Sequence, residues 1–198
     1  MAKADATFDL RGLVRQAARL GKLTPQVLAQ VEQRTMSTLA RRLPVEASRL
    51  ASEQIVNLPR AIVRKGLSAR ASGPAGERAV VLTGSRTRIP LSKFGGRYGG
   101  RRTPGATAQP YRDGGRVTYK SSFAIKGRGI RGGIWTRLPK HAPTKPGIDR
   151  NRFIIQRKGP SISRAILDRK HGDIIPALSD FAGTVLSSEA QRLFKAVR

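Results

Sequence analysis

The sequence predicts an α+β fold in which a long kinked N-terminal helix and C-terminal helices pack on a small antiparallel β-sheet, with a long Gly/Arg-rich loop or arm. Apolar residues recur with a helical period over residues 1–71 and again over 159–198. In residues 72–158 the period shortens to that of strands, and the 21 Gly and 12 Pro residues of the chain indicate a sizeable fraction of loop. The order of helices, hairpins and helices favours this fold over a parallel βαβ arrangement, and 198 residues suit one domain.

Two helices are predicted in the N-terminal part. The first covers residues 10–20, where apolar residues recur at helical spacing and Gly21 follows as a stop signal. The second begins near Thr24, which precedes Pro25 as an N-cap precedes a proline at the first helical position. Its apolar stripe continues past Pro44, so we expect one long bent helix, with a division at this proline as the alternative. The stripe indicates core packing, and coiled-coil dimerisation is the second interpretation.

The middle of the chain is predicted to form antiparallel strands. A short amphipathic segment at 62–67 and the breaker-rich segment 72–76 precede it. Strands are expected at residues 79–83, 89–94, 117–119, 123–125, 134–138 and 153–155, with a turn at 127–133. The segment 95–115 has almost no aliphatic residues but several Gly and Arg, so we expect it to be a long functional loop or arm.

The C-terminal part, residues 159–198, is predicted to contain two helices that pack back on the same domain. Ser161 follows Gly159 and Pro160 where the first of them begins, so its expected role is that of an N-cap and not of a nucleophile. The second helix is expected from about Asp173 and carries a regular apolar stripe.

The charge of the chain is its strongest functional signal. It has 39 Lys and Arg residues against 12 Asp and Glu, a net charge of +27. Between residues 84 and 158 the acids are limited to Asp113 and Asp149. Because closely spaced like charges repel, a folded form needs counter-ions, nucleic acid or an acidic neighbouring subunit. We therefore expect a polyanionic partner, with a merely soluble cationic protein as the alternative.

The candidate contact residues are arginines placed among glycines in this basic region. Guanidinium groups bind phosphate bidentately, glycine lets a ligand approach the backbone, and Tyr98 and Tyr111 could stack on bases or pack on a neighbouring subunit. The residues expected to face DNA or an acidic neighbour are Arg97, Arg101, Arg102, Arg112, Arg128 and Arg131. For each of these arginines, the alternative interpretation is a solvated charge on a loop that contacts no partner. The sequence contains no recognisable base-reading motif, so we expect backbone contacts that are indifferent to nucleotide sequence.

Enzymatic and metal-binding functions are not expected. The G-x-G-x-x-G match at 127–132 is followed by a strand and not by a helix, so it predicts a turn and not a dinucleotide site. The chain has no Cys, and neither His141 nor His171 has a neighbour at metal-ligand spacing, so both are expected at the surface. Carboxylates are too scattered for acid–base chemistry. We predict no enzyme activity, no cofactor and no metal.

Targeting signals also bear on the expected location. The first ten residues lack the apolar region of a signal peptide, and no apolar run approaches the length of a membrane-spanning helix. The expectation is a soluble intracellular product with no membrane partner.

Across residues 39–178 the order of segments resembles the prophage minor tail protein Z family, the tail completion proteins of lambda-like siphophages. The resemblance is carried by QIVNLP at 54–59, TRIPLSKF at 87–94, SFAIKG at 122–127, WTR at 135–137 and GPSI at 159–162. The long insertion at 95–115 and Lys158, where the family pattern has a tyrosine, are departures from it.

The resemblance implies a structural virion protein at the head-proximal end of the tail or in the neck. Such a protein would form a homo-oligomeric ring, expected to be a hexamer, around the DNA channel. Its partners would be tail terminator, tail tube or neck proteins and the genomic double-stranded DNA, and it would reside in the host cytoplasm during assembly. A ribosome-associated or nucleoid-type RNA- or DNA-binding protein is the alternative that the basic charge also suits.

Overall fold

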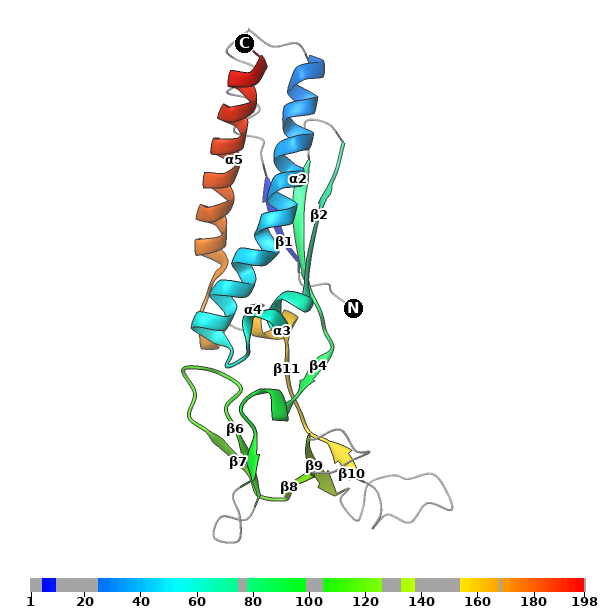
Figure 1. The fold of residues 1–198 in the computed structure, drawn as a ribbon, viewed down its shortest axis with the longest axis vertical. Coiled ribbons are helices and arrows are strands. Elements are labelled where there is room, and N and C mark those ends of the chain that lie inside the picture. Colours follow the sequence, from blue (N-terminus) through cyan, green and yellow to red (C-terminus); the bar gives the residue numbers. More distant parts are fainter. Residues whose placement is uncertain are drawn as a thin grey trace, which may run out of the picture.

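The computed structural model describes residues 5–9, 25–74, 78–98, 105–125, 133–137, 154–167 and 169–197. It confirms the predicted α+β class, with helices and small antiparallel sheets. The molecule is elongated: two long helices and one sheet form a helical end, and the remaining small sheets form the opposite end, called here the β end (Figure 1). The predicted helix at 10–20 lies outside the described residues.

The long bent helix predicted in the N-terminal part is confirmed. Helix α2 spans Pro25–Leu50 and continues directly into a π-helical turn, η1, at Ala51–Ile55. Pro44 lies inside α2 without ending it, and Figure 1 shows the helix axis changing direction along its length. The apolar stripe is buried, with Met36, Leu39, Leu43, Ala47, Ala51 and Ile55 all fully inaccessible to solvent.

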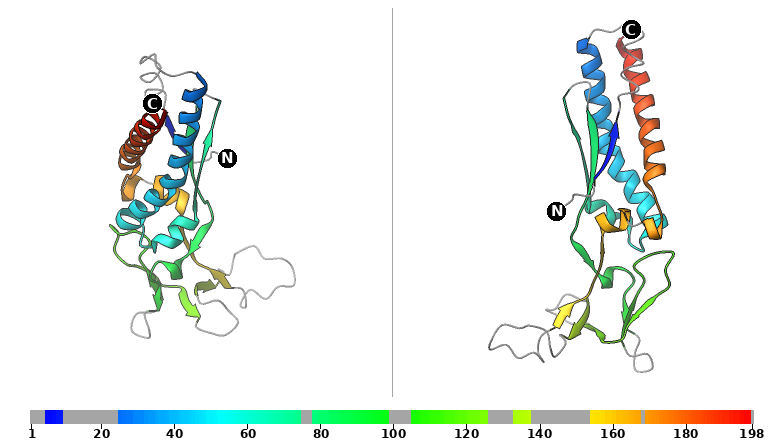
Figure 2. Two further views of the ribbon diagram at one scale, coloured as in Figure 1. Left: turned by 45° about the horizontal axis from the view of Figure 1, so that its top comes forward. Right: turned by 180° about the vertical axis from the view of Figure 1, so that it is seen from behind.

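The second long helix, α5, spans Ile175–Val197 and runs antiparallel to α2 (Figure 2). Its start is fixed by Asp173, whose Oδ1 accepts a hydrogen bond of 2.9 Å from the backbone N–H of Ile175. Leu178 and Ala182 are buried on the side of α5 that packs in the core with α2. The predicted position of this helix is therefore confirmed.

A three-stranded antiparallel sheet lies against α2, with strand order β1-β3-β2. Its strands are β1 at Asp5–Asp9, β3 at Ala79–Gly84 and β2 at Leu67–Ser72. Val80 and Leu82 of β3 are buried, whereas the residues that alternate with them are half-buried, as expected when helices cover one face of a sheet. Strand β3 was predicted, but β1 and β2 were not.

Strand β2 shows why the sequence prediction failed in this region. The amphipathic segment expected at 62–67 forms helix α3 at Arg60–Lys65, but Leu67 already begins strand β2, which lies in the part of the chain predicted to be helical. The six residues of β2 are mostly Ser, Ala and Arg, which have little intrinsic strand preference. They nevertheless pair with all six residues of β3, and Gly73 with a φ of 107° begins the return of the chain. Pairing with β3 thus outweighs local propensity.

A two-stranded ribbon connects the two ends of the molecule. It pairs β4 at Arg88–Pro90 with β11 at Lys158–Ser161. The strand expected at 89–94 ends at Pro90, and the chain continues as the 3-10 turn η2 at Leu91–Lys93. Helix α4 at Ile162–Leu167 follows β11. The Ser161 hydroxyl accepts a hydrogen bond of 3.2 Å from the backbone N–H of Arg164, which confirms the predicted N-cap.

Two further three-stranded antiparallel sheets complete the β end. One has the order β5-β6-β7 and the other the order β10-β9-β8. Their strands are β5 at Arg97–Tyr98, β6 at Ala106–Ala108, β7 at Val117–Tyr119, β8 at Ser122–Ile125, β9 at Gly133–Arg137 and β10 at Ile154–Gln156. The strands expected from residue 117 onward are confirmed. The segment 95–115 is not an uninterrupted loop, because β5 and β6 form within it, and its residues 99–104 lie outside the described part, as do residues 126–132 of the predicted turn.

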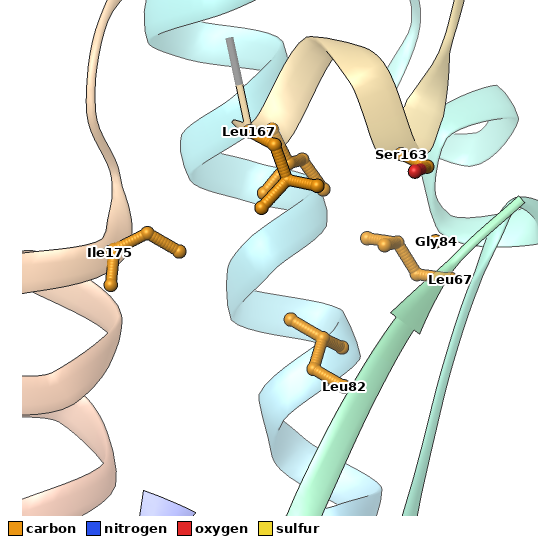
Figure 3. Close-up of a pocket in the computed structure, with 7 residues that line it drawn as sticks. Leu67, Leu82, Gly84, Ser163, Leu167 and Ile175 are labelled. Atoms are coloured by element: carbon orange, nitrogen blue, oxygen red, sulfur yellow. The ribbon is translucent and has the colours of Figure 1, made fainter. Parts of the chain in front are cut away.

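One continuous core joins both ends. Fully buried Leu91 and Phe94 of the β end belong to the same apolar cluster as Leu39 and Leu178 of the long helices. A cavity of about 20 Å³ lies between α4, α5 and the β1-β3-β2 sheet, lined mainly by Leu67, Leu82, Gly84, Ser163, Ile166, Leu167 and Ile175 (Figure 3). It has room for about one water molecule and is too small for a substrate. Among the described residues, no helix has the combined length and hydropathy that crossing a bilayer requires.

Candidate nucleic-acid and subunit interface

The described surface of the β end and of the connecting ribbon is strongly cationic. Its exposed basic residues are Arg86, Arg88, Lys93, Arg97, Arg112, Arg116, Lys120, Arg137, Arg157 and Lys158. Asp113 is the one acidic residue that the structure describes between positions 84 and 161, and its carboxylate contacts His171. The charge asymmetry predicted from the sequence is therefore found on the folded surface.

Two of the six predicted contact residues lie in the described part of the chain. Arg97 is exposed in β5, and Arg112 is exposed in the loop between β6 and β7. Arg101, Arg102, Arg128 and Arg131 lie outside the described residues.

Arg97 stands beside a second arginine that was not among the predicted contact residues. Thr107 of β6 is the register partner of Arg97. The Thr107 hydroxyl accepts a hydrogen bond of 3.2 Å from Nη1 of Arg116, and the same nitrogen donates to the carbonyl of Gly95 at 2.9 Å. Arg116 is thus held against the β5-β6 pair, and two cations flank Thr107 on this sheet. Only the pairing of β5 with β6 reveals this neighbourhood, because Arg97 and Arg116 are far apart in sequence.

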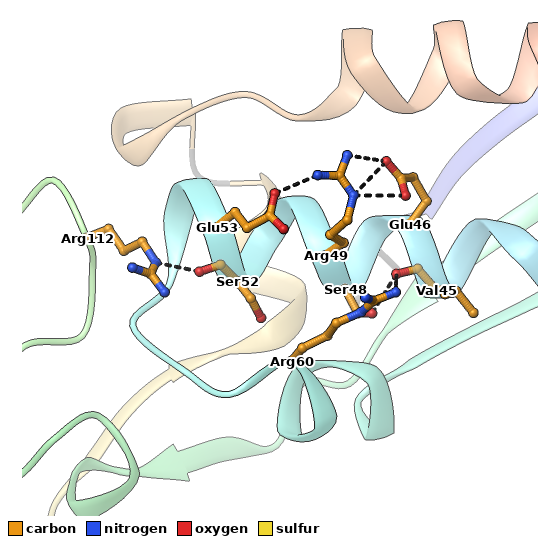
Figure 4. A network of polar contacts seen from close by, with 8 residues as sticks. All are labelled: Val45, Glu46, Ser48, Arg49, Ser52, Glu53, Arg60 and Arg112. Atoms are coloured by element: carbon orange, nitrogen blue, oxygen red, sulfur yellow. Dashed lines mark hydrogen bonds and ion pairs between the residues drawn. The ribbon is translucent and has the colours of Figure 1, made fainter.

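Arg112 is exposed, but it also makes hydrogen bonds to the long helix. Its backbone N–H donates to the carbonyl of Ile55 at 2.9 Å, and Nε of its guanidinium donates to the carbonyl of Ser52 (Figure 4). These carbonyls belong to the last turn of the α2–η1 helix, where backbone acceptors lack helical partners and the helix dipole is negative. Arg112 therefore fastens the β end to the C-terminus of the long helix.

The residues on either side of Arg112 make a second contact with the helical end. The ring of Tyr111 stacks on that of His171, with centroids 3.6 Å apart and an interplanar angle of 12°. Nδ1 of His171 lies 2.9 Å from Oδ2 of Asp113, and this hydrogen bond is the main cause that lowers the pKa of the Asp113 carboxyl. His171 was expected at the surface, but its side chain is only 19% exposed. Tyr111, expected to stack on a base or pack on a neighbouring subunit, packs on an imidazole of its own chain.

Arg157 adds a cation near β7. Its backbone bridges two elements, because its N–H donates to the carbonyl of Ile134 at 2.8 Å and its carbonyl accepts from Leu91 at 3.0 Å. Burial raises the pKa of the nearby Tyr119 hydroxyl, and the charge of Arg157 partly opposes this rise. Backbone hydrogen bonds thus fix where the Arg157 side chain leaves the surface.

Three acidic side chains of the helical end are paired with arginines on the same helix. Arg49 contacts Glu46 and Glu53 at 2.6 Å each, and hydrogen bonds from Arg49 lower the pKa of Glu46 (Figure 4). On α5, Arg192 contacts Glu189 at 2.8 Å. These short-range pairs leave the excess of positive charge concentrated at the β end and the ribbon.

The chemistry of this surface is that of anion binding. Guanidinium and ammonium groups project from strands and turns whose backbones are hydrogen-bonded, an arrangement that attracts phosphate groups without reading base identity. The described residues hold no group of three or more His, Asp or Glu side chains placed to bind a metal ion. Comparison of the chain with protein-family models, with curated proteins and with solved structures finds no match.

Proposed function

We propose that this chain is a structural virion protein of a tailed bacteriophage, a tail completion or minor tail protein. It forms a homo-oligomeric ring, with six subunits expected, at the head-proximal end of the tail or in the neck. The observation that carries the proposal is the set of exposed cations at the β end. Asp113 is the one acid that the structure describes in this region, and it is already paired with His171. The resemblance of segments such as those at 54–59 and 159–162 to the minor tail protein Z family supports it.

The physical requirements of such a ring agree with this surface. Genomic double-stranded DNA passing through a channel must be held weakly and without sequence preference, which backbone contacts by Lys and Arg achieve. A closed ring needs head-to-tail contacts between copies, and an elongated subunit can place a basic end at the channel while its helices contact neighbours. Tail terminator, tail tube or neck proteins would flank the ring, and assembly would take place in the host cytoplasm.

The test combines particle size with infectivity. The wild-type chain should sediment as a ring, and it should restore infectious, DNA-filled particles to a phage lacking its gene. The variant Arg97→Glu, Arg101→Glu, Arg102→Glu should fail to restore them. Arg34→Glu, Arg41→Glu, Arg70→Glu makes the same change of charge at exposed positions of the helical end. It serves as the matched control once sedimentation shows that it still forms the ring.

Two results would contradict the proposal. Full infectivity of the β-end variant would remove the role assigned to these arginines. A wild-type chain that remains a monomer and shifts tightly onto RNA, with a steep dependence on salt, would instead support a ribosome-associated or nucleoid-type protein.

A further inference from the structure

Three chain segments meet between the helical end and the β end. They are the end of α3 with Gly66, the turn after β3 with Ser85, and the start of α4 with Ser163. The N–H of Ser85 donates to the carbonyl of Gly66 at 2.7 Å, and the N–H of Ser163 donates to the carbonyl of Ser85 at 3.0 Å. These two hydrogen bonds tie the three segments together.

The packing around the glycines of this meeting point is tight. A Cβ atom added to Gly84 would lie 2.8 Å from Cα of Ser163, and one added to Gly66 would lie 2.7 Å from Cγ1 of Ile162. The close approach of the Ser163 backbone to Gly84, and of the Ile162 side chain to Gly66, is possible because both positions are glycine. The relative positions of the three segments are therefore set by contacts that tolerate little displacement.

Each segment presents an exposed basic residue next to these hydrogen bonds. Lys65 precedes Gly66, Arg86 follows Ser85, and Arg164 follows Ser163. Arg88 joins them from β4, because its register partner in β11 is Ser161, the residue that caps α4. We name this set the junction cluster: Lys65, Arg86, Arg88 and Arg164, all of them exposed.

The segments that carry the junction cluster contain no described acid, and η1, which packs on α3 and α4, contributes Glu53, which is already paired with Arg49. Neither residues 60–74 and 78–98 nor residues 154–167, from which the cluster is built, include an Asp or Glu that the structure describes. Four cations brought together by the fold repel one another, so a bound anion would stabilise this arrangement. Sequence reasoning could not find the cluster, because Lys65 and Arg164 are brought together only by tertiary structure.

We propose that the junction cluster is a binding site for the phosphate backbone of duplex DNA, separate from the contact predicted at the Gly/Arg-rich segment. The choice of duplex DNA as the ligand rests on the proposed function. In Figure 1 the cluster's elements α3, α4, β4 and β11 lie between the long helices and strands β6 and β7. Arg97 and the junction cluster therefore contact backbone phosphates at different points along the molecule.

The composition of the site favours a nucleic acid over an acidic protein. Protein interfaces are centred on buried apolar or aromatic anchors, whereas backbone binding requires little besides accessible cations. The large apolar residues that are exposed in the described part are Val45, Val117, Ile155 and Leu167. Of these, Leu167 belongs to α4, and Figure 3 places it at the opposite end of that helix from Ser163, beside Ile175. The cluster itself lacks an apolar anchor.

The test is the salt dependence of binding to a fluorescently labelled duplex of random sequence, measured with the full chain. Lys65→Gln, Arg86→Gln, Arg88→Gln, Arg164→Gln in one variant should weaken binding. It should also reduce the slope of log K against log salt by about 0.9 for each phosphate that the variant no longer neutralises. The matched control is Arg34→Gln, Arg41→Gln, Arg70→Gln, Lys195→Gln, four exposed cations of the helical end with the same decrease of charge. The control should leave the slope close to the wild-type value.

A second variant tests whether charge or shape matters. Arg86→Lys, Arg88→Lys, Arg164→Lys retains the charges and should keep the wild-type slope, and thermal unfolding of each variant verifies that it is folded. If the cluster variant and the control had equal slopes of log K against log salt, the proposed site would be overturned. Ring formation and infectivity would still test the proposed function independently. A wild-type chain that binds an acidic polypeptide but no duplex at any salt concentration would also overturn the proposed site and would indicate a protein partner.

Discussion

Asp113 and His171 join the two ends of the molecule although 58 residues separate them in the chain, with Oδ2 and Nδ1 lying 2.9 Å apart. The same short loop stacks Tyr111 on the imidazole and places Arg112 on the last turn of the α2–η1 helix. Residues 110–113 thus act as a clasp between the basic β end and the helices. The clasp fixes the orientation of the β end relative to the helices.

The lowered pKa of Asp113 predicts a pH-dependent contribution of this clasp to stability. Because the folded-state pKa lies below the ordinary value of 3.8, the native state binds fewer protons at this carboxyl than the unfolded state. The contribution is therefore present above the unfolded-state pKa and is lost as the pH falls through the folded-state pKa. We expect Asp113→Asn to lower the Tm at pH values above 3.8, and the difference from wild type to shrink as the pH falls below this ordinary pKa. Thermal unfolding followed by circular dichroism measures the two Tm values at each pH. A Tm difference that does not change with pH would contradict the prediction.

Arg112 and Arg97 should differ in their effects on stability. Arg112→Gln removes the hydrogen bond from the guanidinium to the Ser52 carbonyl and should lower the free energy of unfolding by about 1 kcal/mol. Arg97→Gln, at an exposed site for which no such side-chain contact is described, should stay within about 0.5 kcal/mol of wild type. Urea denaturation compares the two. Equal decreases in stability would mean that the contact between Arg112 and the helix end contributes nothing measurable.

Two glycines should respond to alanine with opposite signs. At Gly84 the new Cβ would lie 2.8 Å from Cα of Ser163, so Gly84→Ala should cost about 1 to 3 kcal/mol through overpacking. At Gly183, inside α5, a Cβ would meet nothing within 4 Å, so Gly183→Ala should stabilise by about 0.5 to 1 kcal/mol. Both changes add one methyl group, and each is a control for the other in urea denaturation. A stabilising Gly84→Ala would show that the three segments at Ser163 can move apart.

The helices were predictable from sequence because their signals are local. The proline at the start of α2, the apolar spacing along it and the Ser161 cap are all contained within a few neighbouring residues. Strands β1 and β2 were missed because their formation depends on pairing with β3, from positions before and after α2. Strand β11 was missed for the same reason, since Gly159 and Pro160 are unfavourable strand residues that pair with β4 only in the folded chain.

The positive charge of the candidate site could be predicted from the sequence, but the arrangement of its residues could not. Counting acids and bases is enough to find the cationic region, whereas the contact of Arg112 with Ser52 spans 60 residues and cannot be read from spacing. Arg116 beside Thr107 and the junction cluster likewise depend on which strands and turns meet. The sequence therefore predicts the cationic character of the site, whereas the arrangement of its residues requires the structure.

The packing of Phe94 on Gly159 gives a prediction about how the β end is attached to the core. Phe94 is fully buried, and a Cβ added to Gly159 would lie 2.6 Å from Cε2 of its ring. Phe94→Ala should therefore lower the free energy of unfolding by about 3 to 5 kcal/mol, because it empties the space between β11 and the β end. Gly159→Ala should cost about 1 to 3 kcal/mol through the clash with the ring.

A double-mutant cycle tests whether these two effects share one contact. Phe94→Leu removes the part of the ring that the new methyl group would strike, so Phe94→Leu combined with Gly159→Ala should be more stable than the sum of the single changes predicts. The expected coupling is about 0.5 to 3 kcal/mol, measured by urea denaturation of the four proteins. Gly84→Ala in place of Gly159→Ala is the control, because its clash is with Ser163 and not with Phe94. Strict additivity at Gly159 would mean that β11 moves away from the ring, and the ribbon would then not be the fixed connection between the two ends.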